Sequence, residues 1–158
     1  MNALVTCGGG FLGLYITEQL GAQGSNVRVF CRGEYARLKE LGVETVQGDV
    51  RDSVALHKAC NGIDTVFHVA AVPGIWGSWK KFQSVKTVGT QNVIDACRGN
   101  GVQRLIYTSA TSVIYDGRPN EGVDESIPYP PIDSYLCHYT KSKALAEQAV
   151  LAENKKDG

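Results

Sequence analysis

Five short apolar runs alternate with stretches of helical periodicity along this chain, and the alternation limits the fold to a small set. The runs suited to buried strands are Ala3–Thr6, Val27–Cys31, Glu44–Gln47, Thr65–Val69 and Leu105–Thr108. The stretches predicted as helices are Phe11–Ala22, a short segment capped by Asp52 or Ser53 and ending at Cys60, Phe82–Arg98, and Tyr139–Glu153. Strands joined through helices pair in parallel by right-handed crossovers. We therefore expect an α/β fold, a doubly wound parallel sheet of Rossmann type with strand order 3-2-1-4-5.

Composition excludes several classes of protein. The chain has 158 residues, 43% of them apolar and 20% charged, which suits one globular domain over residues 1–158. Sixteen basic residues balance sixteen acidic ones, so nothing favours a nucleic-acid partner. No apolar run is long enough for a transmembrane helix, and the start MNALVTCGGG lacks the basic region of a signal peptide, so we expect a cytoplasmic protein.

The five cysteines support the same location. They are spread widely, odd in number and without a C-x-x-C pair. Such a pattern indicates buried thiols in a reducing compartment, and it favours neither a disulfide framework nor a metal site.

A glycine-rich turn follows the first predicted strand and opens the first predicted helix. Gly8, Gly10 and Gly13 form G-x-G-x-x-G, with Phe11 and Leu12 at the helix start. Residues without Cβ let a backbone approach a pyrophosphate, whose charge a helix N-terminus stabilises. This context predicts a dinucleotide site; the alternative is a turn that uses glycine only for tightness.

The ends of the second and third strands indicate which dinucleotide binds. No carboxylate ends the second strand to accept the ribose 2′-hydroxyl, and Arg32 stands there instead. An arginine suits a 2′-phosphate, so we predict NADP in preference to NAD, which remains an alternative. Asp49 and Val50 follow the third strand, and Asp49 has two interpretations: an acceptor for the adenine amino group or a helix cap.

Tyr139 and Lys143 form Y-x-x-x-K, a spacing that puts both side chains on one helix face. A free tyrosine has a pKa near 10, and a neighbouring ammonium favours the phenolate. The pair can therefore exchange a proton with a carbonyl or alcohol during hydride transfer. The alternative is an ordinary helix face.

The segment from Thr111 to His138 is rich in glycine and proline and breaks the alternation. A stretch of that length inside a compact domain is usually a functional loop, and the alternative is a mobile surface excursion.

With these motifs placed, the chain resembles the extended short-chain dehydrogenase/reductases, and within them the 3β-hydroxysteroid dehydrogenase branch. The resemblance covers nearly the whole chain and is carried by LVTCGGGFLG, GDVRD, VFHVAA, VGTQNVIDAC, RLIYTSATSV and YTKSKALAE. The segment GIWGSW and the residues from Asp116 to Ser126 look like those of 2-alkyl-3-oxoalkanoate reductases and sterol-4α-carboxylate 3-dehydrogenases.

The resemblance implies NAD(P)-dependent chemistry at a 3-hydroxy or 3-oxo group of an apolar small molecule, either a β-keto acid or a sterol. It assigns the proton donor and acceptor to Tyr139 and the ribose-binding lysine to Lys143. Ala70 and Ala71 would line the adenosine side, and a homodimer is expected by analogy. Trp76, Trp79 and the 111–138 loop would line the substrate side, although tryptophans equally serve packing.

Three substitutions depart from the family pattern. Cys7 stands where the family has the first glycine of its turn, and cysteine is strained there if φ is positive. Ala110 replaces a serine or threonine that hydrogen-bonds the substrate carbonyl. Ser109, Thr111 and Ser112 are the candidate substitutes, although strand alternation points Ser109 and Thr111 away from the side of Ala110. Lys86 replaces an asparagine.

Length is a fourth departure, because family members run to about twice this size and their later part supplies a substrate subdomain. Two alternatives therefore accompany the oxidoreductase reading. One is a dinucleotide-binding module with little or no turnover, and the other is an extended reductase of the sugar-nucleotide epimerase or dehydratase type.

Overall fold

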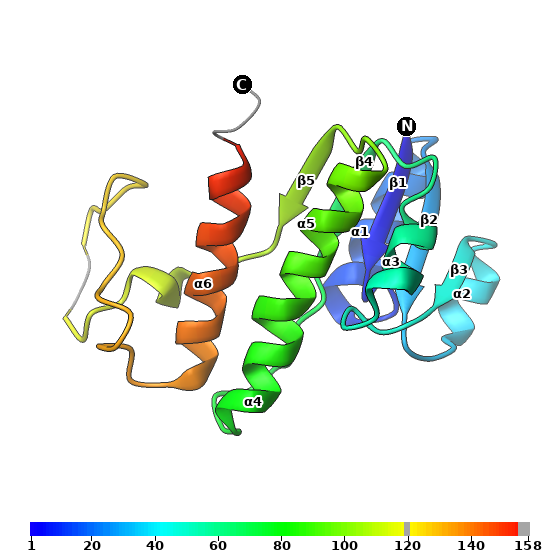
Figure 1. Ribbon diagram of the computed structural model, residues 1–158. Helices are drawn as coiled ribbons and strands as arrows, with labels where there is room; N and C mark the ends of the chain where they lie inside the picture. The colour runs from blue at the N-terminus through cyan, green and yellow to red at the C-terminus, as the bar shows by residue number, and fades with distance from the viewer. Residues whose placement is uncertain (119–120, 155–158) are drawn as a thin grey trace.

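A five-stranded parallel sheet of order β3-β2-β1-β4-β5 forms the centre of the computed structural model, which describes residues 1–118 and 121–154. Figure 1 shows the strands side by side with the helices on either face. The strands are β1 (Asn2–Thr6), β2 (Asn26–Cys31), β3 (Glu44–Gln47), β4 (Thr65–His68) and β5 (Arg104–Tyr107). The predicted sheet and its strand order are confirmed, each strand within one residue or two of its expected bounds.

Helices cover both faces of this sheet. Those before β4 are α1 (Phe11–Ala22), α2 (Ala36–Glu40) and α3 (Ser53–Ala59). Those after it are α4 (Trp79–Phe82), the π-helical segment η1 (Gln83–Val88), α5 (Gly89–Gly99), the 3-10 turn η2 (Thr111–Ile114) and α6 (His138–Glu153). The sequence analysis missed α2 and η2, since elements of four or five residues leave no clear periodicity. No helix of the described chain is long and apolar enough to cross a membrane.

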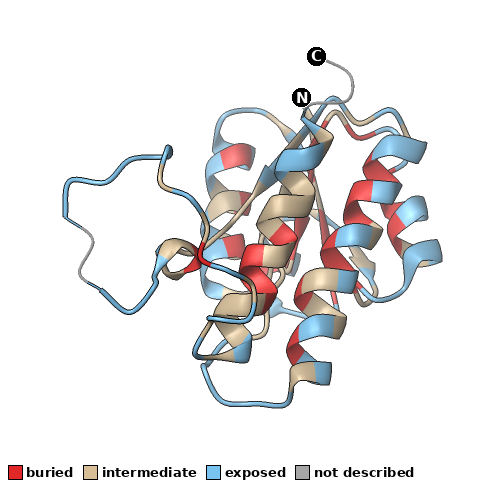
Figure 2. Cartoon of the chain, turned by 60° about the vertical axis from the view of Figure 1, so that its left-hand side comes forward, coloured by how far each residue is buried: buried red, intermediate tan, exposed pale blue. Residues whose placement is uncertain are grey.

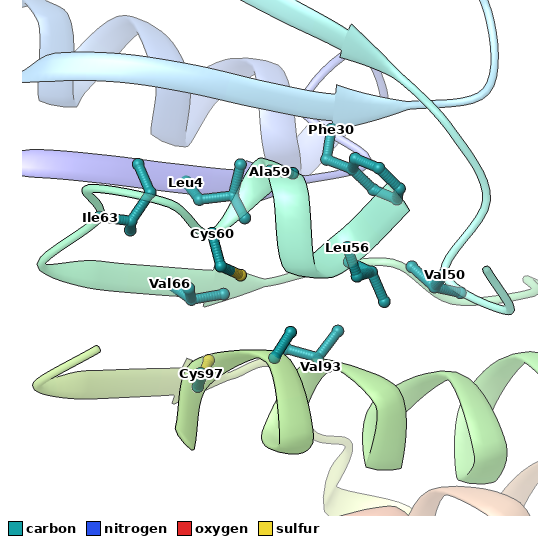
Figure 3. Packing of buried hydrophobic residues seen from close by; sticks show 11 residues of the cluster. Leu4, Phe30, Val50, Leu56, Ala59, Cys60, Ile63, Val66, Val93 and Cys97 are labelled. Carbon is teal, nitrogen blue, oxygen red and sulfur yellow. The ribbon is translucent and has the colours of Figure 1, made fainter. Parts of the chain in front are cut away.

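The core lies in two layers, because successive side chains of a strand point to opposite faces. On one face Leu4 and Val66 pack against α3 and α5, and Figure 3 shows this cluster, to which Cys60 and Cys97 belong. On the other face Ala3, Val5 and Val29 pack against α1 and α2. The central strand β1 is therefore buried on both sides, whereas β5 stands at the edge of the sheet.

Helix boundaries follow capping as well as periodicity. The carboxylate of Asp52 accepts a hydrogen bond from the backbone N–H of Ala55 and caps α3, as one of the two predicted caps. The long helix predicted from Phe82 instead begins at Trp79, because the Ser78 hydroxyl caps α4. It continues through the π-helical turn into α5, an irregularity that apolar spacing did not indicate.

The segment between η2 and α6 is a largely exposed excursion without further helix or strand in its described part, as Figure 2 shows. Pro119 and Asn120, inside the stretch expected to be a loop, and residues 155–158 lie outside the described residues. All five cysteines are free. The expectation of buried thiols is wrong for Cys7 and Cys137, which are half-buried because they lie at turns beyond the sheet.

Candidate functional site

The glycine turn connects β1 to α1 and packs tightly. A Cβ on Gly13 would lie 2.3 Å from the backbone oxygen of Cys7, and one on Gly8 would lie 2.7 Å from the methyl groups of Val29. Packing alone therefore explains these two glycines. Gly10 is the N-cap of α1 and provides no side-chain hydrogen bond, so the first turn of the helix lacks a side-chain cap that would compete with an anion.

Cys7 adopts φ of 59°, a left-handed conformation that costs an L-residue about 1–2 kcal/mol. It is the one non-glycine residue with positive φ among those described. The strain anticipated at this position is present. The backbone N–H of Cys7 donates to Phe30 at 2.7 Å and its oxygen accepts from Gly10 at 3.0 Å, so the tight turn holds the residue in place.

A cavity opens beside the turn, at the carboxyl ends of β1, β2, β3 and β4. Five of its lining residues were predicted to bind the cofactor: Arg32, Asp49, Val50, Ala70 and Ala71. Its other lining residues are Cys7, Phe30, Cys31, Tyr35, Gly48, Val72 and Val85. A crevice at the carboxyl ends of parallel strands, where the strand order reverses, is where doubly wound sheets bind ligands.

Asp49 proves to be neither the helix cap nor an unpaired acceptor. Its carboxylate accepts hydrogen bonds from the Arg51 side chain at 2.8 and 2.9 Å and from the Arg51 backbone at 3.0 Å. These bonds lower the pKa of Asp49 to about 2 and keep it charged. Asp52 takes the capping role. The guanidinium of Arg32 is exposed at the cavity and forms no ion pair with the described residues.

A buried hydrogen-bond chain joins β1, β4 and α5 next to this cavity. The hydroxyl of Thr6 accepts from the backbone N–H groups of Val69 and Ala70, both at 3.0 Å, so its own hydrogen is left for Nδ1 of His68 at 2.9 Å. The imidazole then carries its proton on Nε2 and donates to Thr90 at 2.9 Å. Burial and the nearby charge of Lys143 lower the pKa of His68 to about 3, so the ring stays neutral.

The sequence analysis missed this chain of groups, although its histidine stands inside the VFHVAA motif. These hydrogen bonds hold the backbone of Val69 and Ala70, of which Ala70 lines the cavity.

Tyr139 and Lys143 lie one turn apart on α6, which faces η1 and the end of β5. Lys143 is 4% exposed, and its Nζ donates to the backbone oxygen of Thr108 at 2.5 Å and lies 4.5 Å from the centre of the Tyr107 ring. Burial lowers the pKa of Lys143 to about 8, with Glu147 acting in the opposite direction. Tyr139 is half-buried, and its ring meets that of Phe82 edge-to-face at 6.2 Å.

Lys86, in η1, packs against the ring of Tyr139. It is 2% exposed, and its Nζ lies 3.0 Å from the centre of the Tyr139 ring and 4.8 Å from that of Phe82. No hydrogen-bond partner for this nitrogen exists among the described residues. The sequence marked Lys86 only as a departure from the family; its place over the tyrosine follows from the packing of η1 on α6.

Ser109 and Thr111 lie on a separate surface. The hydroxyl of Ser109 donates to the carboxylate of Glu147, which also accepts from Tyr129 at 2.6 Å. Thr111 is exposed and opens η2. Both line an open, mainly apolar groove between the 111–138 segment and α6, whose lining includes neither Tyr139 nor Lys143.

The two tryptophans differ. Trp79 packs against the ring of His138 at 5.9 Å, whereas Trp76 is 88% exposed. Packing therefore accounts for Trp79 alone.

Residues 4–158 match the 3-beta hydroxysteroid dehydrogenase/isomerase family. The chain belongs to this family. The resemblance read from the sequence is thereby confirmed. A 2-alkyl-3-oxoalkanoate reductase of Stenotrophomonas maltophilia is 42% identical over 156 residues, which cover 98% of this chain and 47% of that protein. The human sterol-4-alpha-carboxylate 3-dehydrogenase is 40% identical over 149 residues, covering 93% of this chain and 38% of that protein.

Solved structures agree with this family assignment. A short-chain dehydrogenase/reductase from Agrobacterium tumefaciens with bound NAD superposes with a TM-score of 0.85 at 28% identity, covering 99% of this chain and 46% of that one. The NAD complex of Thermus thermophilus UDP-glucose 4-epimerase gives 0.85 at 30% identity, covering 98% and 51%. This member of the 3-beta hydroxysteroid dehydrogenase/isomerase family thus spans about half or less of the relatives it matches.

Proposed function

We propose that this chain carries the cofactor-binding and proton-transfer part of an NAD(P)-dependent oxidoreductase that acts on a 3-hydroxy or 3-oxo group of an apolar small molecule. The observation that carries this proposal is the buried ammonium of Lys143, one helical turn from Tyr139 at the carboxyl end of β5. The β-keto acid and sterol substrates come from the names of the relatives.

The chain's own residues supply the proton chemistry. Tyr139 would give its phenolic proton to the substrate oxygen in reduction and take it back in oxidation. The hydrogen bond from Lys143 to the backbone oxygen of Thr108 fixes the position of the ammonium one helical turn from Tyr139. Lys143 would hold the nicotinamide ribose, and the bound nicotinamide would supply or accept the hydride.

The nucleotide end of the site fits a dinucleotide. The N-terminus of α1, with Phe11 and Leu12 in its first turn, offers backbone amides without a side-chain cap, and the neighbouring cavity is the place proposed for the adenosine. We propose NADP, because Arg32 presents an exposed guanidinium where a 2′-phosphate would lie and the Asp49 carboxylate is already paired with Arg51.

The substrate end is more open. The apolar groove beside Thr111 and the exposed Trp76 are the candidate contacts for an apolar substrate. Ser109 would serve as a carbonyl donor only after leaving Glu147, since its hydroxyl is engaged there. A homodimer and a cytoplasmic location belong to the same proposal by analogy with the family, and light scattering at micromolar concentration tests the dimer.

Turnover provides the direct test. The chain is incubated with NADPH and a 2-alkyl-3-oxo acid, absorbance is followed, and Tyr139→Phe is compared with Tyr15→Phe, which removes an exposed hydroxyl on α1. We expect Tyr139→Phe to lower the rate by about 10²–10⁴-fold and Tyr15→Phe to leave it unchanged. Equal rates in the two variants would exclude Tyr139 as the proton donor.

A binding module with little turnover is the second candidate, favoured by the strained Cys7 and by Ala110 in place of a hydroxyl residue. NADPH binding without turnover, measured by fluorescence in the same samples, would select it. An epimerase reading has support from the NAD-bound UDP-glucose 4-epimerase structure, and UDP-glucose offered as substrate separates it from the oxidoreductase.

A further inference from the structure

The space between η1 and α6 holds two buried ammonium groups within reach of one tyrosine. Lys143 has a hydrogen-bond acceptor in Thr108, whereas Lys86 has none among the described residues, and its nitrogen lies over the faces of the Tyr139 and Phe82 rings. Removing a lysine from water without an acceptor is costly, so an aromatic face in contact with the cation is the main compensation available.

The local backbone favours this placement. Lys86 lies in the π-helical turn Gln83–Val88, and such turns inside α-helices occur frequently at functional sites. The hydroxyl of Thr87 donates to the backbone oxygen of Ser142 at 3.4 Å and ties the turn to α6, and the Tyr139 ring rests edge-on against Phe82. Lys86 is therefore held against the ring by its surroundings.

We propose that Lys86 is a positioning residue for Tyr139, because its charge over the ring face fixes the orientation of the phenol ring. This inference rests on the proposed function for its catalytic meaning, but the contact between the two side chains can be tested without turnover. A cation 3.0 Å from the ring centre is attracted to the ring face, so the charge of Lys86 and the environment of the Tyr139 ring are coupled.

Lys86 loses its charge near neutral pH. Burial and the Lys143 ammonium lower the pKa of Lys86 to about 7, while the Cys137 thiol opposes them. The titratable groups that face Lys86 are Lys143 and Tyr139 on α6 and Cys137 at the N-cap of this helix. On α4, the Phe82 ring faces Lys86, whereas Lys80 and Lys81 are exposed to solvent. On α5, Asp95 is exposed to solvent as well. The coupling should therefore be strong below pH 7 and fade above pH 8.

NMR of the full chain labelled with ¹³C at the tyrosine ζ carbons tests this inference, with the Tyr139 signal assigned from Tyr139→Phe. In the unsubstituted chain we expect a chemical-shift step at Tyr139 with a midpoint near pH 7, well below phenol ionisation. Lys86→Met, which keeps the volume and removes the charge, should abolish the step. Lys86→Arg keeps the charge at every pH, so the signal should stay at its low-pH position throughout the titration.

Two outcomes overturn the proposal: a step near pH 7 that persists in Lys86→Met, or no step in the unsubstituted chain. If circular dichroism shows that Lys86→Arg does not fold, the NMR comparison of the unsubstituted chain with Lys86→Met tests the proposal. Failure of the proposed function would look different, because Tyr139→Phe would then retain turnover while the NMR step remained. In an active chain, a turnover pH profile that changes shape in Lys86→Met would distinguish positioning from mere packing.

Discussion

The hydroxyl of Thr6 and the imidazole of His68 are joined by a hydrogen bond of 2.9 Å at the buried ends of β1 and β4. The same hydroxyl accepts from the backbone N–H groups of Val69 and Ala70, and Ala70 lines the cavity proposed to hold the cofactor. A single oxygen thus connects the sheet interior to the proposed cofactor site.

Replacing this oxygen should destabilise the chain. Thr6→Val keeps the shape but leaves two buried N–H groups and one ring nitrogen without their partner, and we expect a loss of about 2–4 kcal/mol in the free energy of unfolding. Urea denaturation measures it. Thr45→Val, at an exposed position on the edge strand β3, is the control and should change stability by less than about 0.5 kcal/mol. Equal losses of stability in Thr6→Val and Thr45→Val would show that the hydrogen bonds of Thr6 do not stabilise the fold.

Acid should destabilise the fold through His68. Its pKa is lowered to about 3 in the folded chain, against about 6.5 in an unfolded one, so the unfolded state binds the proton first as the pH falls. The contribution of neutral His68 to the free energy of unfolding is complete above about pH 6.5. Below about pH 6.5 it is lost at up to about 1.4 kcal/mol per pH unit. The slope of unfolding free energy between pH 6.5 and 5 should flatten in His68→Gln and persist in His57→Gln, which alters a different histidine. A slope unchanged by His68→Gln would contradict the assignment.

Cofactor choice should depend on Arg32. We expect Arg32→Ser to weaken binding of 2′-phospho-ADP-ribose by about 10–100-fold, the worth of a charge-assisted hydrogen bond, while binding of ADP-ribose stays the same. Calorimetry with the two ligands measures the difference. Arg118→Ser, in the exposed 111–138 segment, is the matched loss of charge. Tighter binding of ADP-ribose than of its 2′-phosphate by the unsubstituted chain would overturn the NADP proposal.

The strain at Cys7 should be measurable. Because glycine adopts positive φ without steric cost, Cys7→Gly should raise the free energy of unfolding by about 1 kcal/mol. Cys7→Ala retains a Cβ and should give no such gain. Chemical denaturation of both variants under reducing conditions makes the comparison, and a gain shared by alanine would show that the thiol, rather than the backbone, is unfavourable.

Much of this arrangement could be predicted locally. Apolar runs of four to six residues mark the strands, and α1 begins and ends where its spacing and the glycine turn indicate. Arg32 and Ala70, both predicted to bind the cofactor, line one cavity because the carboxyl ends of parallel strands meet at one edge. By contrast, the π-helical turn around Lys86 depends on packing between η1 and α6, which no periodicity encodes.

The sequence alone determined the parallel sheet, its strand order, the glycine turn and the spacing of Tyr139 and Lys143, because these depend on residues close along the chain or on the handedness of crossovers. Only the tertiary structure decided which polar groups meet: Thr6 with His68, Ser109 with Glu147, and Lys86 with Tyr139. The first two pairs lie 62 and 38 residues apart in the chain, and Lys86 and Tyr139 lie on different helices. These groups meet because a polar group removed from water is stabilised by the polar or aromatic neighbour that the fold places beside it.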